Sequence, residues 1–128
     1  MINYSKMKEN MILSQLLPGG ISDEKIIESF RSTPREHFLK EENKSLAYSD
    51  SILNLDSQRY LITPFSLSRM INAAKINSDE MVLVIGSNTG YESVIISKLS
   101  STVIALDSNK RFKLLAEKNI RDLNINNI

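Results

Sequence analysis

The sequence contains no cysteine, no tryptophan and a single histidine, His37. The absence of cysteine excludes disulfides, thiolate metal sites and a thiol nucleophile. One histidine excludes a multi-histidine metal site, so we expect no bound metal, and a histidine-based catalytic triad would depend on His37 alone.

The chain also lacks an excess of charge of either sign. Its 16 Lys and Arg residues nearly balance its 15 Asp and Glu residues, so no broad basic field for nucleic acid is indicated. No apolar run approaches the roughly 18 residues that indicate a membrane span. The N-terminal residues 1–15 are too polar for a signal peptide. We therefore expect a cytoplasmic protein without a nucleic-acid or membrane partner.

What is present suits one globular core: 128 residues, of which 41% are hydrophobic and 24% are charged. Two regions nonetheless differ in pattern. Residues 1–75 are predicted to be helical with irregular connections. Residues 76–128 have the pattern of a strand, a helix, a second strand and a second helix. We expect an α/β protein in which an N-terminal helical region precedes a β-α-β-α unit.

Helices are predicted in the first region over residues 5–17 and 65–74. Ser22 is the expected N-cap of a further helix, and Thr33 is expected to cap a helix that begins at Pro34. The core-facing residues predicted for helix 65–74 are Leu67, Met70, Ile71 and Ala74.

Two continuous apolar runs, residues 81–85 and 102–106, mark the second region. Such β-branched runs are typical of strands buried on both faces of a parallel sheet. Helices are predicted over 91–99 and 109–123, and the connection between the strands should be right-handed.

A glycine-containing turn, Gly86-Ser87-Asn88-Thr89-Gly90-Tyr91, follows the first of these strands, and Asp107 closes the second. A strand that turns into a helix presents backbone N–H groups to a ligand. A carboxylate at the end of the next strand can accept hydrogen bonds from both hydroxyls of a ribose. The alternative is that Gly86 and Gly90 only form a turn and Asp107 only caps a helix.

The spacing of the turn discriminates among nucleotide sites. A dinucleotide fingerprint needs glycine at positions 86, 88 and 91, but positions 88 and 91 are Asn88 and Tyr91. A P-loop needs a Gly-Lys-Ser/Thr sequence, which is absent. Gly86-x-Asn88-x-Gly90 is instead similar to the G-x-G-x-G turn of S-adenosylmethionine-dependent methyltransferases.

Four segments in order resemble the protein-L-isoaspartate O-methyltransferase family, in a divergent bacterial branch. The four segments are Thr33 to Phe38, Leu46 to Asp50, Gln58 to Pro64 and Val82 to Tyr91. The resemblance implies an incomplete doubly wound, Rossmann-like methyltransferase fold with S-adenosyl-L-methionine as cofactor. It also implies protein repair by methylation of the α-carboxyl of L-isoaspartyl residues, with such a protein or peptide as substrate.

The resemblance also implies site residues. The expected cofactor-binding residues are Gly86, Ser87, Asn88, Gly90, Tyr91 and Asp107. Asp50 keeps the acidic position of the family's Ala-Tyr-x-Asp segment, and Thr63 offers a hydroxyl beside Pro64. We take Asp50 and Thr63 as the catalytic candidates. The alternatives are packing for Tyr91 and loop or helix capping for Asp50 and Thr63.

Three positions depart from the family pattern. Val84 stands where the family has an acidic residue that helps hold the methionine amino group. Losing a charge-assisted hydrogen bond costs about 1.5–3 kcal/mol, or about one to two decades of affinity. Asn88 replaces the middle glycine, although Asn tolerates left-handed backbone angles. Ile62 replaces a serine near the methyl-transfer site.

Relative to the family, the sequence stops before the third strand, after residues 76–128 have supplied the first β-α-β-α part of the cofactor domain. Two parallel strands form a poor sheet by themselves. A homo-oligomer, a partner fragment or the missing C-terminal half would complete it. Catalysis by this chain alone is therefore doubtful. The alternatives are a truncated, inactive relative that serves as an interaction module, half of a split enzyme, or an unrelated nucleotide-binding protein.

Overall fold

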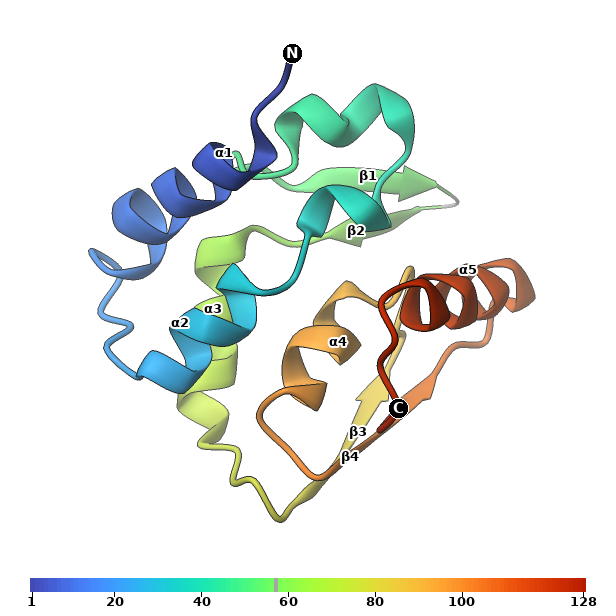
Figure 1. The fold of residues 1–128 in the computed structure, drawn as a ribbon. Helices are drawn as coiled ribbons and strands as arrows, with labels where there is room; N and C mark the ends of the chain where they lie inside the picture. The colour runs from blue at the N-terminus through green and yellow to red at the C-terminus, as the bar shows by residue number, and fades with distance from the viewer. Residues whose placement is uncertain (57) are drawn as a thin grey trace. The chain divides into compact units, whose positions relative to one another are not determined.

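The computed structural model describes residues 1–56 and 58–128, which form two units, Met1–Lys75 and Ile76–Ile128 (Figure 1). The first unit contains α1 (Tyr4–Met11), α2 (Glu24–Arg31), β1 (Leu53–Asp56), β2 (Arg59–Leu61) and α3 (Pro64–Ala74). The second contains β3 (Met81–Ile85), α4 (Tyr91–Ser97), β4 (Thr102–Leu106) and α5 (Lys110–Asp122). Within the described part of the chain, no helix has the length and apolar character that crossing a bilayer requires.

The core of the first unit is built from the apolar sides of its helices. A π-helical turn, Ile12–Leu16, follows α1 directly, and its residues Ile12 and Leu16 are buried. In α1, this turn and α2, the buried apolar side chains are Met11, Ile12, Leu16, Ile26, Ile27 and Phe30. Burial of each such side chain contributes about 1.5–3 kcal/mol, which is the main stabilisation of these short helices.

The inward stripe of α3 differs from the predicted one. The stripe consists of Pro64, Leu67, Ser68 and Ile71. Met70 is 63% exposed and Ala74 is also exposed, so their predicted core positions are wrong. Both stripes fit the helical period, but Ser68 satisfies its hydroxyl by donating to the Phe65 carbonyl at 2.8 Å and can therefore be buried.

Two predicted helix caps are also wrong. Asp23, not Ser22, caps α2, because the Asp23 carboxylate accepts the Lys25 N–H at 2.9 Å. The Thr33 hydroxyl does not cap the following 3₁₀ helix, Arg35–Phe38. It donates to the Ser29 carbonyl of α2 at 2.7 Å instead. Pro34 therefore stands at the N-cap position of the 3₁₀ helix, which has no side-chain cap.

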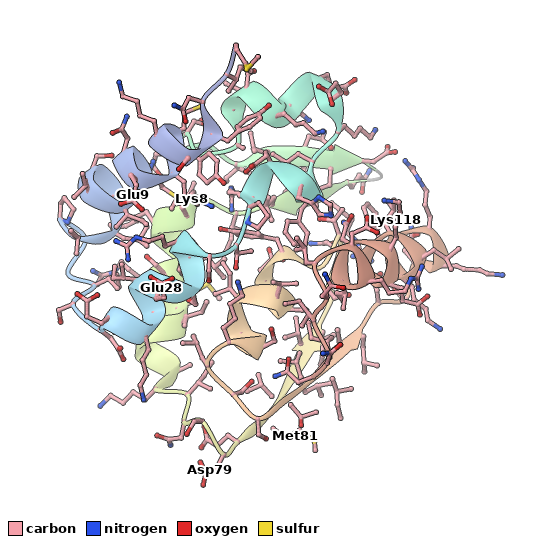
Figure 2. All side chains as sticks on the ribbon, in the orientation of Figure 1. Lys8, Glu9, Glu28, Asp79, Met81 and Lys118 are labelled. Atoms are coloured by element: carbon pink, nitrogen blue, oxygen red, sulfur yellow. The ribbon has the colours of Figure 1, made fainter. Side chains whose placement is uncertain are left out.

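An ion pair between Arg31 and Glu9 joins α2 to α1. Arg31 lies 2.7 Å from a Glu9 oxygen and 3.0 Å from a Glu28 oxygen, and both acidic residues are labelled in Figure 2. The hydrogen bond to Glu9, followed by that to Glu28, raises the pKa of Arg31 above its ordinary value. Because the three side chains are partly exposed, solvent screening limits the pair to roughly 0–1 kcal/mol.

A second 3₁₀ helix, Glu41–Leu46, leads to the hairpin of β1 and β2. The two strands pair antiparallel, with Leu53 opposite Leu61 and a register irregularity between Asn54 and Asp56. After the hairpin, the chain continues into α3, which begins at Pro64.

The second unit is a parallel β-α-β-α arrangement. The register runs from Met81 opposite Thr102 to Ile85 opposite Leu106, so the predicted bounds of both strands are confirmed. The helices of the unit bury only the face of the sheet that carries Val103. The opposite face is exposed, and the predicted burial of both strand faces is therefore wrong.

Candidate functional site

The turn after β3 is tied to the end of β4 by backbone hydrogen bonds. The N–H groups of Gly86 and Ser87 both donate to the Leu106 carbonyl, at 2.8 and 3.0 Å. The Gly90 N–H then donates to the Ser87 carbonyl at 2.9 Å and closes the turn at the start of α4. The turn thus continues the sheet and has a fixed position within the second unit.

Three residues of the turn adopt left-handed backbone angles, with φ of +76° at Gly86, +51° at Asn88 and +97° at Gly90. A Cβ atom on Gly90 would meet the Cβ atom of Ala116 in α5 at 3.4 Å, so glycine here serves close packing. A Cβ atom on Gly86 would meet nothing within 4 Å. The Gly86 backbone therefore borders open space that a ligand can approach.

Asp107 connects the turn to the start of α5. One carboxylate oxygen accepts the Asn88 N–H at 2.9 Å, and the other accepts the Asn109 N–H at 2.8 Å. These bonds hold Asn88 in its left-handed conformation. Asp107 is partly exposed, so its carboxylate can be approached from solvent.

A groove of about 710 Å³ begins at this point and runs between β4 and α5. Ser87 and Asp107 line it, together with the outer edge of β4. The predicted cofactor residues Gly86, Ser87, Asn88, Gly90 and Asp107 are therefore held in one hydrogen-bonded cluster at the carboxyl ends of two parallel strands. Ligands of open α/β sheets bind at that edge.

The far side of the turn is buried. The Asn119 side-chain amide of α5 donates to the Thr89 carbonyl at 2.9 Å. Tyr91 has no exposed surface, and the hydroxyls of Thr89 and Ser93 are buried without a hydrogen-bond partner among the described residues. Sequence reasoning missed Asn119, although a polar residue within the apolar stripe of α5 was a usable signal.

The two catalytic candidates belong to the first unit. Asp50 lines a cavity of about 370 Å³. Other residues that line this cavity are Ser14, Gln15, Gly19, Phe65 and Arg69. Arg69 donates to the Gly19 carbonyl at 2.7 Å, and its guanidinium lies 5.7 Å from the centre of the Phe65 ring. The cavity therefore combines an acidic and a basic group. Thr63 is not among its described lining residues.

Thr63 is the N-cap of α3. Its hydroxyl oxygen accepts the Ser66 N–H at 3.0 Å, and Pro64 occupies the first position of the helix. This geometry gives Thr63 a structural task that is independent of any role with substrate.

Replacing Thr63 by Ala is expected to lower the free energy of unfolding by about 1 kcal/mol, because the Ser66 N–H loses its acceptor. Thr63→Ser keeps the cap and is the matched control. Urea unfolding followed by circular dichroism measures both variants. Equal stability of Thr63→Ala and the parent chain would contradict the cap's contribution.

A buried polar network supports the segment before Pro64. Arg35 has no exposed surface and donates to the Ile62 carbonyl at 2.7 Å. The Tyr48 hydroxyl accepts the Arg35 backbone N–H at 3.1 Å and donates to the Glu36 carboxylate. Sequence reasoning did not connect these residues, because the bonds join segments that are distant in the chain.

Over the described ranges, no group of three His, Asp or Glu side chains lies close enough together to hold a metal ion.

Comparison with known proteins is consistent with this geometry. The family model described as protein-L-isoaspartate(D-aspartate) O-methyltransferase matches residues 6–128. Protein-L-isoaspartate O-methyltransferase 1 of Syntrophobacter fumaroxidans is 28% identical over 128 residues, which are 100% of this chain and 60% of that protein. The Protochlamydia amoebophila enzyme is 32% identical over 118 residues, covering 92% of this chain and 56% of its own length.

Two solved structures share the fold. A protein-L-isoaspartate O-methyltransferase matches with a TM-score of 0.83 and 26% identity, over 94% of this chain and 40% of that one. A Plasmodium falciparum protein, solved in complex with S-adenosyl-L-homocysteine, matches with a TM-score of 0.71 and 23% identity, over 99% and 61%. The predicted Rossmann-like α/β fold is confirmed. The chain thus spans 56% to 60% of the length of these two curated relatives.

Proposed function

Because the chain belongs to the protein-L-isoaspartate O-methyltransferase family, we propose that its second unit binds S-adenosyl-L-methionine at the turn after β3. The observation that carries this proposal is the double role of Asp107, which accepts the Asn88 and Asn109 N–H groups and stands at the mouth of the groove. In this proposal, ribose hydroxyls donate hydrogen bonds to the Asp107 carboxylate.

The residues of the turn suit this cofactor. Gly86 borders open space, so the cofactor can contact the backbone there. Asn88 leaves the turn intact, because its left-handed angle is held by the bond to Asp107. The position that does not suit the cofactor is Val84, which cannot accept a hydrogen bond from an ammonium group. We therefore propose that Asp107 contacts the ribose of the cofactor, whereas Val84 provides no hydrogen-bond acceptor for the amino group of its methionine part.

For the whole protein we propose methylation of the α-carboxyl of L-isoaspartyl residues, as a step of protein repair. When bound, S-adenosylmethionine supplies an electrophilic methyl group. The acceptor carboxylate is already a nucleophile, so the protein needs to position it rather than remove a proton. Asp50 and Thr63 are proposed on the acceptor side. Arg69, in the cavity with Asp50, offers a cation for an acidic acceptor group.

Two glycines allow a matched test of the cofactor site. Gly86 and Gly20 both have positive φ, +76° and +90°, and a Cβ atom on either would meet nothing within 4 Å. Alanine at either position introduces similar backbone strain, about 1–2 kcal/mol. Only at Gly86 would the added methyl group occupy cofactor space.

Titration calorimetry with S-adenosylhomocysteine gives the readout. We expect weak binding by the parent chain, about tenfold weaker binding by Gly86→Ala, and unchanged affinity for Gly20→Ala. Absence of heat at millimolar ligand with a folded parent chain would refute cofactor binding by these 128 residues.

A second candidate function is a catalytically inactive relative that serves as an interaction module or as half of a split enzyme. The loss of the acidic group at Val84 and the exposed sheet face of the second unit favour it. Assay of methyl transfer to an isoaspartyl peptide separates the two candidates. Methyl transfer catalysed by the purified chain alone would exclude the catalytically inactive candidate.

A further inference from the structure

A solvent-exposed turn, residues 77–80, directly precedes β3. The Glu80 N–H donates to the Asn77 carbonyl at 3.1 Å, which closes a β-turn. Every residue of the turn is exposed, and Asp79 and the following Met81 are labelled in Figure 2. Small polar residues in such a turn are open to reaction with solvent.

The sequence contains two asparagines that are followed by a small residue, Asn72 before Ala73 and Asn77 before Ser78. Asparagine is thermally labile, because its side-chain amide can react with the backbone nitrogen of the next residue. A small following side chain leaves that nitrogen open to approach, whereas a β-branched side chain crowds it. These two positions are therefore the candidates for this reaction.

The structure distinguishes the two candidates. Asn72 lies within α3, where the helical hydrogen-bond pattern holds the backbone N–H groups. The Ser78 N–H, by contrast, donates to no group among the residues that the structure describes. The Ser78 nitrogen can therefore approach the Asn77 side chain without first breaking a hydrogen bond.

Glu80 holds Asn77 in the turn without preventing this approach. The Glu80 carboxylate accepts the Asn77 backbone N–H at 2.9 Å, and its other oxygen lies 3.4 Å from the Asn77 side-chain nitrogen. The second distance is long for an N–H···O hydrogen bond, so the side-chain amide is held only weakly. Its rotation toward the Ser78 nitrogen therefore costs little.

We infer that Asn77 converts without an enzyme to an isoaspartyl residue, which makes the turn before β3 a modification site of the chain. The Ser78 nitrogen bonds to the Asn77 Cγ atom, the bond between Cγ and Nδ2 breaks, and Nδ2 leaves as ammonia with the proton of the Ser78 N–H. Water then opens the cyclic imide. Opening at the Asn77 backbone carbonyl gives the isoaspartyl residue, and opening at Cγ gives aspartate.

This inference goes beyond the proposed function. It does not depend on cofactor binding or on methyl transfer by the chain. An isoaspartyl residue is nevertheless the group for which the matching family is named. The chain would thus itself present the kind of residue on which the proposed function acts.

Aspartates before serine can form the same cyclic imide, and the sequence has three of them: Asp50, Asp56 and Asp107. An ionised carboxylate is a poorer electrophile than an amide. The Asp107 carboxylate also accepts two backbone N–H groups. We therefore expect these positions to react more slowly than Asn77.

The modification would affect the start of β3. It adds a carboxylate beside that of Glu80, and the like charges repel each other. The Glu80 carbonyl accepts the Ser101 N–H at 2.9 Å and the Ser101 hydroxyl at 3.0 Å, so Glu80 links the start of β3 to the segment before β4. Repulsion at Glu80 thus weakens a connection within the second unit.

Peptide mapping by mass spectrometry, after storage of the chain at neutral pH, tests the inference. Trypsin cuts after Lys and Arg and releases residues 76–98 as one peptide, which contains both Asn77 and Asn88. Asn88 is an internal control, because the β-branched Thr89 follows it. We expect Asn77 to deamidate at least about tenfold faster than Asn88. Fragmentation by electron transfer should identify isoaspartate, since only this product has its Cα–Cβ bond in the backbone.

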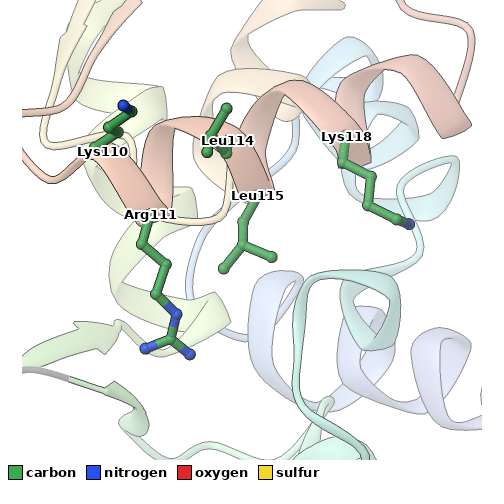
Figure 3. A pocket seen from close by; sticks show the side chains of 5 residues that line it. All are labelled: Lys110, Arg111, Leu114, Leu115 and Lys118. Carbon is green, nitrogen blue, oxygen red and sulfur yellow. The ribbon is translucent and has the colours of Figure 1, made fainter.

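Asn109 is a second internal control. Lys110 follows it, and Figure 3 shows this long side chain at the start of α5. The Asn109 side chain caps the helix by accepting the N–H groups of Arg111 and Phe112 at 3.0 and 3.3 Å. Because the cap holds its side chain, Asn109 should also deamidate at least about tenfold more slowly than Asn77.

Ser78→Val and Asp79→Ala are matched variants at neighbouring exposed positions of the turn. Valine crowds the attacking nitrogen, so Ser78→Val should slow deamidation of Asn77 at least about tenfold. Asp79→Ala should change the rate less than about twofold. The comparison of asparagines within the parent chain does not require that either variant folds.

Three results would overturn the inference. The first is deamidation of Asn77 no faster than that of Asn88 and Asn109. The second is aspartate as the only product at position 77, which indicates direct hydrolysis of the amide. The third is an equal rate in folded Ser78→Val and in the parent chain.

Discussion

Asp107→Ala is expected to lower the free energy of unfolding of the second unit by about 2–3 kcal/mol. Two backbone N–H groups, of Asn88 and Asn109, lose a charged acceptor in this variant. A hydrogen bond to a charged group contributes about 1.5–3 kcal/mol, and water replaces part of it at a partly exposed site. The same change removes the proposed acceptor for ribose, so affinity for S-adenosylhomocysteine should fall about 100-fold.

Asp79 provides the control for Asp107. It is an exposed acidic residue of the same unit, near the start of β3, and Asp79→Ala removes the same charge (Figure 2). Urea unfolding and titration calorimetry measure both variants. Asp79→Ala should leave stability and affinity unchanged. A similar loss in the two variants would mean that net charge, rather than the hydrogen bonds of Asp107, is responsible.

Val84→Glu is expected to tighten binding of S-adenosylhomocysteine by about 10- to 100-fold. Val84 lies two residues before Gly86, opposite Ala105 in the parallel sheet. A carboxylate at this position would accept a hydrogen bond from the ammonium group of the ligand. The gain corresponds to one charge-assisted hydrogen bond, about 1.5–3 kcal/mol.

The control variant is Val82→Glu, because Val82 lies on the same face of β3 and is also half-buried. Val82→Glu introduces the same charge two residues further from the turn than Val84→Glu. Calorimetry should show tighter binding only for Val84→Glu, after unfolding measurements have established that both variants fold. Equal affinity of the two variants would show that the amino group of the ligand does not approach Val84.

Local sequence signals predicted most of the second unit. The β-branched runs ended at Gly86 and Asp107, and the strand bounds followed from those ends. The same runs wrongly predicted burial of both strand faces. An apolar run reports what the complete fold buries, and the helices of these 128 residues cover one face only.

Prediction was less successful where two neighbouring residues compete for one role. Ser22 and Asp23 are both good caps, and only the backbone angles of the folded chain select Asp23. The stripe of α3 contains Ser68 in place of Met70 because a hydrogen bond within the helix makes serine tolerable inside. Hydropathy alone does not contain that information.

The candidate site was predicted as a set of residues but not as a network. The order Gly86, Gly90, Asp107 indicated a ligand-binding turn. The bond between Asp107 and the Asn88 N–H, which explains how asparagine replaces the family's middle glycine, depends on the approach of two strand ends. The roles of Asp50 and Thr63 with substrate stay predictions.

Asn119 makes the turn observable by NMR spectroscopy. Its side-chain amide is bonded to the Thr89 carbonyl and is 8% exposed. The two amide protons therefore occupy different environments and are shielded from solvent. Their resonances report the state of the turn from α5, so ligand titrations can be followed through a natural probe without a label or substitution within the turn itself.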